Sequence, residues 1–384
     1  MRLSSQANLA AFIAAVLLPF AVAASAGAQG SVSTQGFGYP AGGLSARNAG
    51  TGGALGEFDP LSPLNDAALA SWGATGLYFQ FQPEYRTTNS IGGQDKTTTV
   101  RFPLLAAGLP LGERWVFGVS TTTFLDRTWR TQRTALANIG GDTATFTETF
   151  GVAGAINDIR VGAAFLVNPN FRIGLAGHAL SGRNRLQINR RYADPVSFAP
   201  FFQASEIDYS GNSISGGIDV RPTRQFALAL SARVGGTIKS FSGDTVLTRA
   251  DVPKHYAGSI LYTGLPGTNI GIRAAWDGWS SLHSLAATNV NAVDGWDIGV
   301  GGETRGVTLF GSALPLRLGV RMRTLPFAVG TQEVKETSIG GGFGLPFGTG
   351  RVSADISVQH ASRTGTPGVS EHAWVLGIGF LVRP

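Results

Sequence analysis

The sequence predicts an all-β fold, a transmembrane antiparallel β-barrel of about 14 strands with an N-terminal plug segment in its lumen. The prediction rests on a hydrophobic pattern of period two, a glycine-rich composition and alternating short and long connections. Of the 384 residues, 54 are Gly, 43% are hydrophobic and 14% are charged. Average soluble proteins contain about 25% charged residues and about 7% Gly, so this is not the composition of an ordinary soluble enzyme. The 23 Phe, 7 Trp and 7 Tyr exclude a disordered chain.

The N-terminus has the features of an export signal. Arg2 precedes an apolar stretch over residues 9–24, and Ala26-Gly27-Ala28 forms a small-residue cleavage site. The apolar stretch is interrupted by Pro19 and is shorter than the roughly 20 residues of a membrane-spanning helix. We therefore expect residues 1–28 to be a signal peptide. The mature chain is then either soluble outside the inner membrane or spans a membrane as strands.

Apolar residues alternate with polar or small ones along many segments, as in strands. Leu77, Phe79, Phe81, Pro83 and Tyr85 share one face of the first such segment, and the pattern recurs over residues 225–237, 316–323, 351–359 and 374–380. A β-sandwich would also alternate. The opposite face favours a barrel, because Gly, Ala, Ser and isolated charges suit a crowded lumen while the apolar face meets lipid. Aromatic residues near segment ends are expected to form interfacial girdles: Tyr85, Trp115, Tyr256, Trp276, Trp296 and Trp374.

Turn residues set the predicted strand number. Short connections are expected at residues 110–112, 168–170, 222–224, 265–267, 306–315 and 346–350, and longer ones at 88–96, 127–157, 181–211, 241–255, 278–294, 325–335 and 362–371. These connections join 14 strands over residues 74–384, and the even number places both termini in the periplasm. Segment 146–156 is either a strand extension or a loop folded inward. Because hydrocarbon leaves no partner for an unpaired edge, the first strand (76–87) must pair with the last (372–380).

Residues 29–73 lack this alternation and are rich in Gly, Pro and Asn. A barrel of this size is wider than the roughly eight strands that side chains alone can fill, so we expect the segment to plug the lumen. The alternative is a periplasmic leader without a role. Its sequence resembles the N-terminal hatch of the FadL superfamily of outer-membrane fatty acid and hydrocarbon transporters, including the PorV-like branch. The matching residues are Arg47, Gly50, Gly52, Gly53, Ala54, Asn65, Ala67, Leu69 and Ala70, and Asp66 stands where the family has Pro.

The resemblance implies a barrel in the outer membrane of a Gram-negative cell, with a hatch that blocks the lumen. It implies passive transport of small, fatty-acid-like hydrophobic compounds without a cofactor, or alternatively a PorV-like scaffold or shuttle in secretion. Expected partners are outer-membrane lipid, the hydrophobic small molecule and the barrel-assembly machinery, whose signal the pattern ending at Phe380 resembles. Pro83 and Pro103 could open a gap in the wall, because proline cannot donate to the ladder. Ordinary edge irregularity is the alternative.

Several arginines share the inward parity, with acidic residues near them in register. Two interpretations stay open: an ion-pair lattice that holds plug to wall, or unpaired arginines that bind carboxylates in the lumen. The arginines are Arg233, Arg273, Arg317, Arg321, Arg323 and Arg351, and the acidic residues are Asp219, Asp277, Asp297, Glu303 and Asp355.

The sequence lacks the motifs of catalysis and metal binding. The five His are scattered, no H-E-x-x-H or G-x-S-x-G motif occurs, and the absence of Cys excludes disulfides and Cys-ligated metals. Ser281 and His283 could imitate a hydrolase pair, but such neighbours in a polar loop are usually solvated. The arginines lie singly and form no basic run, which argues against nucleic-acid binding. We expect no enzyme activity, no metal and no cofactor.

Overall fold

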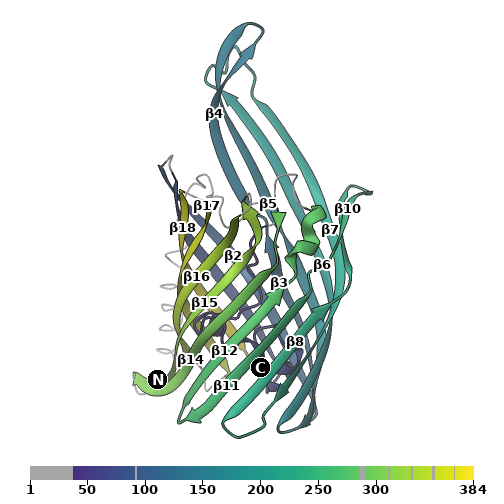
Figure 1. The fold of residues 1–384 in the computed structure, drawn as a ribbon, viewed down its shortest axis with the longest axis vertical. Coiled ribbons are helices and arrows are strands. Elements are labelled where there is room, and N and C mark those ends of the chain that lie inside the picture. The colour runs from purple at the N-terminus through teal and green to yellow at the C-terminus, as the bar shows by residue number, and fades with distance from the viewer. Residues whose placement is uncertain are drawn as a thin grey trace, which may run out of the picture.

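The molecule is a closed β-barrel with inclined strands and a sheet that projects beyond one rim (Figure 1). The computed structural model describes residues 38–90, 93–285, 291–309, 312–329, 332–347, 351–366 and 368–384. The predicted signal peptide and residues 29–37 of the predicted hatch lie outside this range. Among the described residues, no helix has the length and apolar character needed to cross a membrane.

The barrel wall contains 14 antiparallel strands, as predicted. They are β1 (Gly76–Ser90), β2 (Gly93–Leu111), β3 (Trp115–Asp126), β5 (Asp142–Asn168), β6 (Phe171–Tyr192), β7 (Phe201–Val220), β8 (Phe226–Val234), β11 (His255–Leu265), β12 (Thr268–Asp277), β14 (Gly295–Leu309), β15 (Ser312–Val329), β16 (Gln332–Phe347), β17 (Val352–Thr366) and β18 (Val369–Val382). β1 pairs with β18 from Leu77↔Val382 to Asn89↔Ser370. The sheet therefore closes on itself, and no edge of the wall is left for hydrocarbon to meet.

The remaining elements are short or lie beyond the wall. β4 (Trp129–Ile139) continues β3 and pairs with β5, β9 (Thr237–Ser242) and β10 (Thr245–Asp251) form a hairpin, and β13 (Asn291–Ala292) pairs with β15. The helical turns are α2 (Ala46–Ala49), η2 (Gly56–Phe58), η3 (Asp66–Ser71) and η4 (Trp279–Leu285). We call the end with the short connections the turn end and the opposite end the loop end.

Several connections predicted as long loops are strands instead. β5 spans 27 residues and pairs with β4 over residues 142–152, so segment 146–156 is a strand extension and not a loop folded inward. β6 and β7 extend in the same way, and together these strands form the sheet that projects at the top of Figure 1. The predicted loops at 325–335 and 362–371 are mostly strand, because β15, β16, β17 and β18 run almost to their tips.

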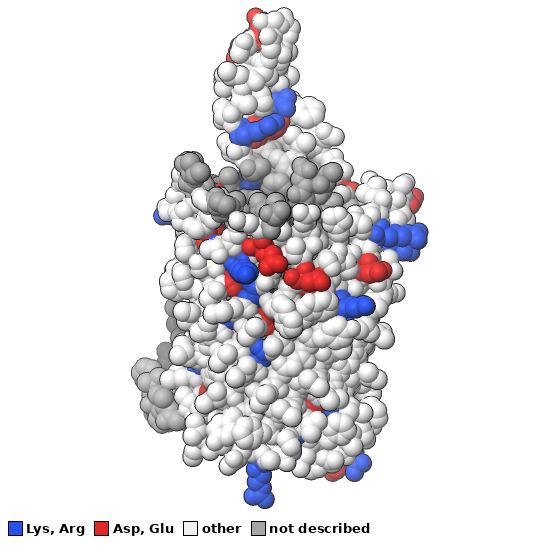
Figure 2. Space-filling view, in the orientation of Figure 1, with Lys and Arg blue, Asp and Glu red and all other residues white. Residues whose placement is uncertain are grey.

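The outer face carries an apolar belt bounded by aromatic side chains. At the loop end, Trp276 lies beside Tyr256 and Trp296 in register. At the turn end, Phe79 stacks on Phe380 with ring centroids 5.1 Å apart. Figure 2 shows few charged side chains over the lower part of the wall. Tyr85 follows Phe79 by six positions along β1, about 20 Å of strand, so the two aromatic rims bound an apolar stretch of the outer face.

The inner face is lined with small residues because the N-terminal segment lies against it. A Cβ at Gly174 of β6 would stand 2.2 Å from the backbone of Asp66, and one at Gly319 of β15 would stand 2.1 Å from the backbone of Thr51. Contacts at such distances are impossible, so glycine is required at both positions. The sequence pattern of small inward residues therefore makes room for backbone as well as for side chains.

Because the belt faces lipid, we expect an arginine substitution within it to affect the stability of the barrel more than the same substitution outside it. Val300→Arg places a charge in the middle of the belt, where Val300 is 46% exposed, and should destabilise the folded barrel by about 2–4 kcal/mol in a bilayer. Leu136→Arg, in the projecting sheet where Leu136 is 69% exposed, should change stability by less than about 0.5 kcal/mol. Urea unfolding in lipid vesicles measures both. Equal effects would contradict a membrane-facing belt.

Candidate functional site

The predicted hatch motif folds into a compact unit around one carboxylate. Asp59 accepts hydrogen bonds from Ser45 Oγ at 2.6 Å, Ser62 Oγ at 2.9 Å and Asn48 Nδ2 at 3.0 Å. Ser45 also caps α2 by accepting from the backbone N–H of Asn48. Gly52 and Gly53 follow with φ of 63° and 80°, in the left-handed region that favours glycine. The turn chemistry of the motif thus fixes the conformation of the segment inside the barrel.

Three residues of the motif join this segment to the wall. Arg47 makes a bidentate ion pair with Glu303 of β14, with both distances 3.0 Å. Asn65 donates to the carbonyl of Ile218 at 3.2 Å and caps η3. Asp66, at the position where the family has Pro, contacts Arg160 Nε at 2.6 Å. At this position the chain therefore has an ion pair that joins η3 to β5.

Six arginines were predicted to face the lumen. All of them except Arg351 have an acidic partner. The pairs are Arg233–Asp158 at 3.0 Å, Arg273–Glu57 at 2.8 Å and Arg273–Asp297 at 2.9 Å, Arg317–Glu303 at 2.8 Å and Arg317–Asp355 at 2.6 Å, Arg321–Asp297 at 2.7 Å, and Arg323–Glu336 at 2.6 Å. Asp219 pairs with Arg172 and Asp277 with His255. Arg351 was expected to point inward, but it is exposed in the turn before β17. This geometry is that of a lattice of ion pairs.

A second charged cluster surrounds Tyr39 and was not predicted. The guanidinium groups of Arg101, Arg323 and Arg363 lie over the Tyr39 ring, 5.1, 4.7 and 4.7 Å from its centroid. The Tyr39 hydroxyl donates to Glu336 at 3.0 Å and accepts from Arg363 at 3.0 Å. Burial raises the pKa of this hydroxyl above its ordinary value, so it remains a donor. The cluster anchors the first described residues of the chain.

Acidic residues from several strands balance the arginines of this Tyr39 cluster. Arg363 is fully buried and contacts Glu336 at 2.6 Å, Glu371 at 2.6 Å and Glu84 at 2.8 Å. Arg101 is held by Asp126 at 2.5 Å and also contacts Glu84. Arg101 on β2 and Arg363 on β17 lie at inward-facing positions of the strand alternation, so the sequence pattern could have indicated both. No sequence signal marks Tyr39, whose partners lie as many as 324 residues away.

The wall is irregular at Pro103. Gln80 pairs with Leu104 and Gln82 with Arg101, so Phe102 and Pro103 together oppose the single residue Phe81, as in a β-bulge. Pairing of β2 with β3 begins at Leu104↔Thr122 and runs toward the turn end. Toward the loop end, within the described strands, β2 stays paired with β1 alone. Pro83 interrupts the β1–β18 ladder between Phe81 and Glu84 without changing its register.

A cavity of about 390 Å³ lies at the part of the wall where β2 leaves β3. Its lining includes Val100, Arg101 and Phe102 of β2, Thr123 and Asp126 of β3, and Gly154 of β5. Phe102 is 73% exposed on the outer face and packs on Phe81, with ring centroids 5.3 Å apart. Because Phe81 lies between Phe79 and Tyr85 along β1, the cavity begins in the middle of the aromatic-bounded belt.

The N-terminal segment takes the place beside β3 that β2 gives up. Tyr39 and Asp126 exchange two backbone hydrogen bonds, at 2.7 and 2.8 Å, and the N–H of Gly42 donates to the carbonyl of Thr123 at 2.8 Å. A Cβ at Gly42 would stand 2.5 Å from that carbonyl oxygen. Residues 39–42 therefore lie directly against the inner side of β3 at the edge of the cavity.

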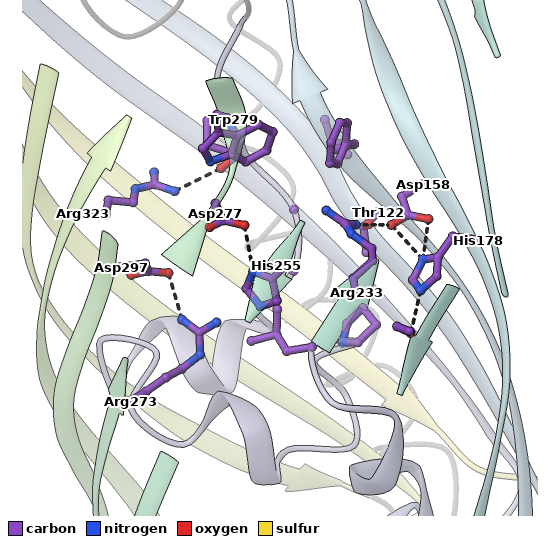
Figure 3. Close-up of a pocket in the computed structure, with 18 of the residues that line it drawn as sticks. Thr122, Asp158, His178, Arg233, His255, Arg273, Asp277, Trp279, Asp297 and Arg323 are labelled. Atoms are coloured by element: carbon purple, nitrogen blue, oxygen red, sulfur yellow. Dashed lines mark hydrogen bonds and ion pairs between the residues drawn. The ribbon is translucent and has the colours of Figure 1, made fainter. Parts of the chain in front are cut away.

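A second cavity, of about 140 Å³, lies inside the lumen (Figure 3). Figure 3 shows charged pairs converging on it, among them Arg233 with Asp158 and Arg273 with Asp297. His178 Nδ1 lies 2.9 Å from Asp158 and its Nε2 lies 2.8 Å from Ser215 Oγ, but that hydroxyl donates to Asp66 at 2.5 Å. The serine hydroxyl is thus shared between His178 of β6 and Asp66 of the N-terminal segment.

The other candidate residues for chemistry remain apart. Ser281 Oγ donates to the backbone carbonyl of Asp251 at 2.9 Å, and His283 is exposed on η4. In the part of the chain that the structure describes, no group of three His, Asp or Glu side chains is placed to hold a metal ion.

No protein-family model matches the sequence, and a search of curated proteins finds no match. Solved structures match along almost the whole chain. A FadL homologue of Pseudomonas aeruginosa superposes with a TM-score of 0.62 at 14% identity, covering 90% of this chain and 99% of that one. The CymD monoaromatic hydrocarbon channel gives 0.56 at 15% identity over 89% and 98%. The toluene transporter TbuX of Ralstonia pickettii gives 0.53 at 14% identity over 89% and 99%. The resemblance to the FadL superfamily is therefore confirmed in its fold, and the chain is a barrel of the FadL type.

Proposed function

We propose that this protein is an outer-membrane channel for small hydrophobic compounds, with a passive route that passes through the barrel wall. The observation that carries the proposal is the cavity beside Phe102, the neighbour of Pro103, which begins inside the apolar belt where β2 leaves β3. The aromatic-bounded belt supports the outer-membrane location. The similar structures, a FadL homologue, a monoaromatic hydrocarbon channel and a toluene transporter, support the class of cargo. Fatty-acid-like molecules belong to the same class.

The chemistry of the lumen favours a route through the wall. The cavity in Figure 3 is lined by ion pairs such as Arg233–Asp158 and Arg321–Asp297. An apolar molecule gains nothing by leaving water for such surroundings, whereas it gains free energy by reaching the hydrocarbon layer. The arginines of the lumen are, on this proposal, a structural lattice that joins the wall to the N-terminal segment. Because each already has a carboxylate partner, binding of a ligand carboxylate there would have to displace one.

The proposed hatch is the segment over residues 29–73, of which residues 38–73 are described. Residues 39–42 lie along β3 at the wall cavity, and Tyr39 holds them there through three guanidinium groups and Glu336. We infer that release of this contact widens the passage. The start of β1 and the end of β18 lie together at the turn end, which supports a periplasmic turn end and folding by the barrel-assembly machinery.

A secretion scaffold of the PorV-like kind is the second candidate. The observation that favours it is the projecting sheet, whose outermost strand β4 is paired with β5 in a continuous ladder beyond the rim of the barrel. Phe201 and Phe202 are exposed on the same sheet. An unpaired edge can add a strand from another protein. Recovery of the barrel with a secreted partner in mild detergent, together with normal hydrocarbon uptake in a strain lacking the gene, would favour this candidate.

Pro103→Val tests the route through the wall. The substitution restores a backbone N–H at the bulge, where the register of β2 against β1 shifts, so β2 can pair more regularly with β1 and narrow the cavity beside it. We expect toluene uptake into proteoliposomes to fall by about threefold or more, with no loss of barrel stability. Pro110→Val, near the turn end of the same strand, is the matched control because Pro110 already pairs with Val116. Unchanged uptake by the Pro103 variant would argue against passage at this place.

Tyr39→Ala tests the hatch. Each cation–π contact contributes about 0.5–2 kcal/mol, so loss of the ring should free residues 39–42 from β3. A single cysteine introduced as Thr123→Cys would be the sole thiol of the chain, and a bilayer-soluble maleimide should modify it several-fold faster in the Tyr39 variant.

Phe146→Ala is the control for general loosening of the barrel. Phe146 is also buried, with the guanidinium of Arg190 4.4 Å from its ring centroid, and it lies on β5 outside the hydrophobic cluster to which Tyr39 belongs. Modification of Thr123→Cys should stay unchanged in this variant. If both aromatic variants accelerate modification equally, Tyr39 has no special part in closure.

A further inference from the structure

The outer face of five strands at the closure of the barrel changes from apolar to polar directly beyond the aromatic rim of the loop end. β16, β17 and β18 lie side by side at the left of Figure 1, and β1 and β2 continue the wall beyond β18. Tyr85 of β1 and Trp374 of β18 pair in register and are 49% and 56% exposed, so both project from the outer face. The residues that follow them on this face, toward the loop end, are of a different kind.

The register of the five strands arranges these outward residues in two rows. The row next to the aromatic pair contains, from β2 to β16, Lys96, Thr87, His372, Ser362 and Thr337. The row beyond it contains, in the same order, Gln94, Asn89, Ser370, Thr364 and Lys335. We call the residues of both rows the seam patch. Every side chain in it can form hydrogen bonds, and none is acidic.

The seam patch is positively charged and has a clear boundary. Lys96 and Lys335 are both exposed, and Glu333 lies two positions beyond Lys335 near the tip of β16. On the other side of β16 the first row continues as Met322 of β15 and Ile298 of β14, which are apolar and 57% and 45% exposed. The polar surface is therefore confined to the five strands, and it offers two ammonium groups without a carboxylate of its own.

Aromatic rings form a ledge along the edge of the seam patch that is nearest the belt. The ring centroid of His360 lies 4.8 Å from that of Trp374 and 5.8 Å from that of His372, and the two imidazole planes differ by only 16°. Tyr85 lies beside Trp374 in register. Flat rings with polar groups at one side suit a sugar, because a sugar ring has C–H groups on its faces and hydroxyl groups around its edge.

We propose that the seam patch binds the head group of a phosphorylated glycolipid in the leaflet that surrounds the loop end. The lysines would pair with phosphate, the hydroxyl and amide side chains would bond to sugar hydroxyls, and the acyl chains would lie along the apolar belt. A simple phospholipid would satisfy the lysines but would offer few partners to the rows of hydroxyl and amide groups. The inference rests on the membrane-facing belt and is independent of the proposed channel.

Lipid A, an acylated and bisphosphorylated disaccharide, is the probe, and its dephosphorylated form is the matched counterpart. Native mass spectrometry of the full barrel in detergent measures the affinity for both. Lys96→Gln and Lys335→Gln should each weaken lipid A binding about fivefold and leave binding of the dephosphorylated form unchanged. Lys254→Gln is the control, because Lys254 is exposed just before β11 and outside the seam patch, and it should affect neither ligand.

Trp374→Leu tests the aromatic ledge. The substitution keeps an apolar side chain at the rim but removes the flat ring, so lipid A binding should fall about threefold while binding of phosphatidylglycerol stays unchanged.

Thiol protection places the ligand. Thr98→Cys introduces the sole thiol of the chain beside Tyr85, and lipid A should slow its modification by a water-soluble methanethiosulfonate. Thr237→Cys, on β9 and outside the seam patch, should react equally with or without lipid A.

Absence of saturable lipid A binding, or an equal loss of affinity in Lys254→Gln, would overturn the site. Phosphatidylglycerol that binds as tightly as lipid A would indicate a surface for anionic lipids in general. Competition by an equal concentration of a soluble hexose phosphate would indicate a site for free sugar phosphates. Either of these two results would overturn the assignment to a glycolipid.

Discussion

Ion pairs between the wall and the N-terminal segment are the interaction on which the architecture depends. Arg160 of the wall pairs with Asp66 of the segment, and Arg273 of the wall pairs with Glu57. In the opposite direction, Arg47 of the segment pairs with a glutamate of β14. Removing one partner of a buried pair costs about 3–5 kcal/mol, because the other charge is left uncompensated. The segment is thus joined electrostatically to the wall, and Arg160 and Arg273 would each lose an acidic partner if the segment left the lumen.

Strand number and closure could be predicted because their signals are local. Period-two alternation and turn residues act over a few neighbours, and they identified the barrel strands. The projecting sheet was missed for a physical reason. In the projecting sheet most of the described side chains over residues 127–151 and 185–207 are exposed or half-buried whichever face they share, so the hydrophobic contrast between faces is weak and the strands read as polar loops. The structural role of Tyr39 could not be predicted either. Its partners, such as Arg363, become adjacent to it only after the barrel closes.

Pro83 and Pro103 have the same sequence signal but different effects on the structure. Both remove a ladder donor, and nothing in the sequence distinguishes them. Pro83 leaves the register of β1 with β18 intact, since Phe81↔Ile378 and Glu84↔Val375 share one alignment. Pro103 belongs to a bulge that shifts the register, and β2 separates from β3 beside it. The difference arises from the neighbouring strand. β1 stays paired with β2 on its other side, whereas β3 finds an alternative partner in residues 39–42.

The N-terminal segment divides the lumen into two chemically different spaces. On the loop side, arginines and carboxylates neutralise one another around a small polar cavity. On the turn side, Arg221 and Arg383 face an apolar wall without a close carboxylate. An apolar molecule gains no free energy by entering the polar cavity on the loop side. A polar molecule loses free energy when it crosses the apolar belt. On the proposed route through the wall an apolar molecule therefore avoids the charged lumen, and the unbalanced charge lies at the end at which the strands begin and finish.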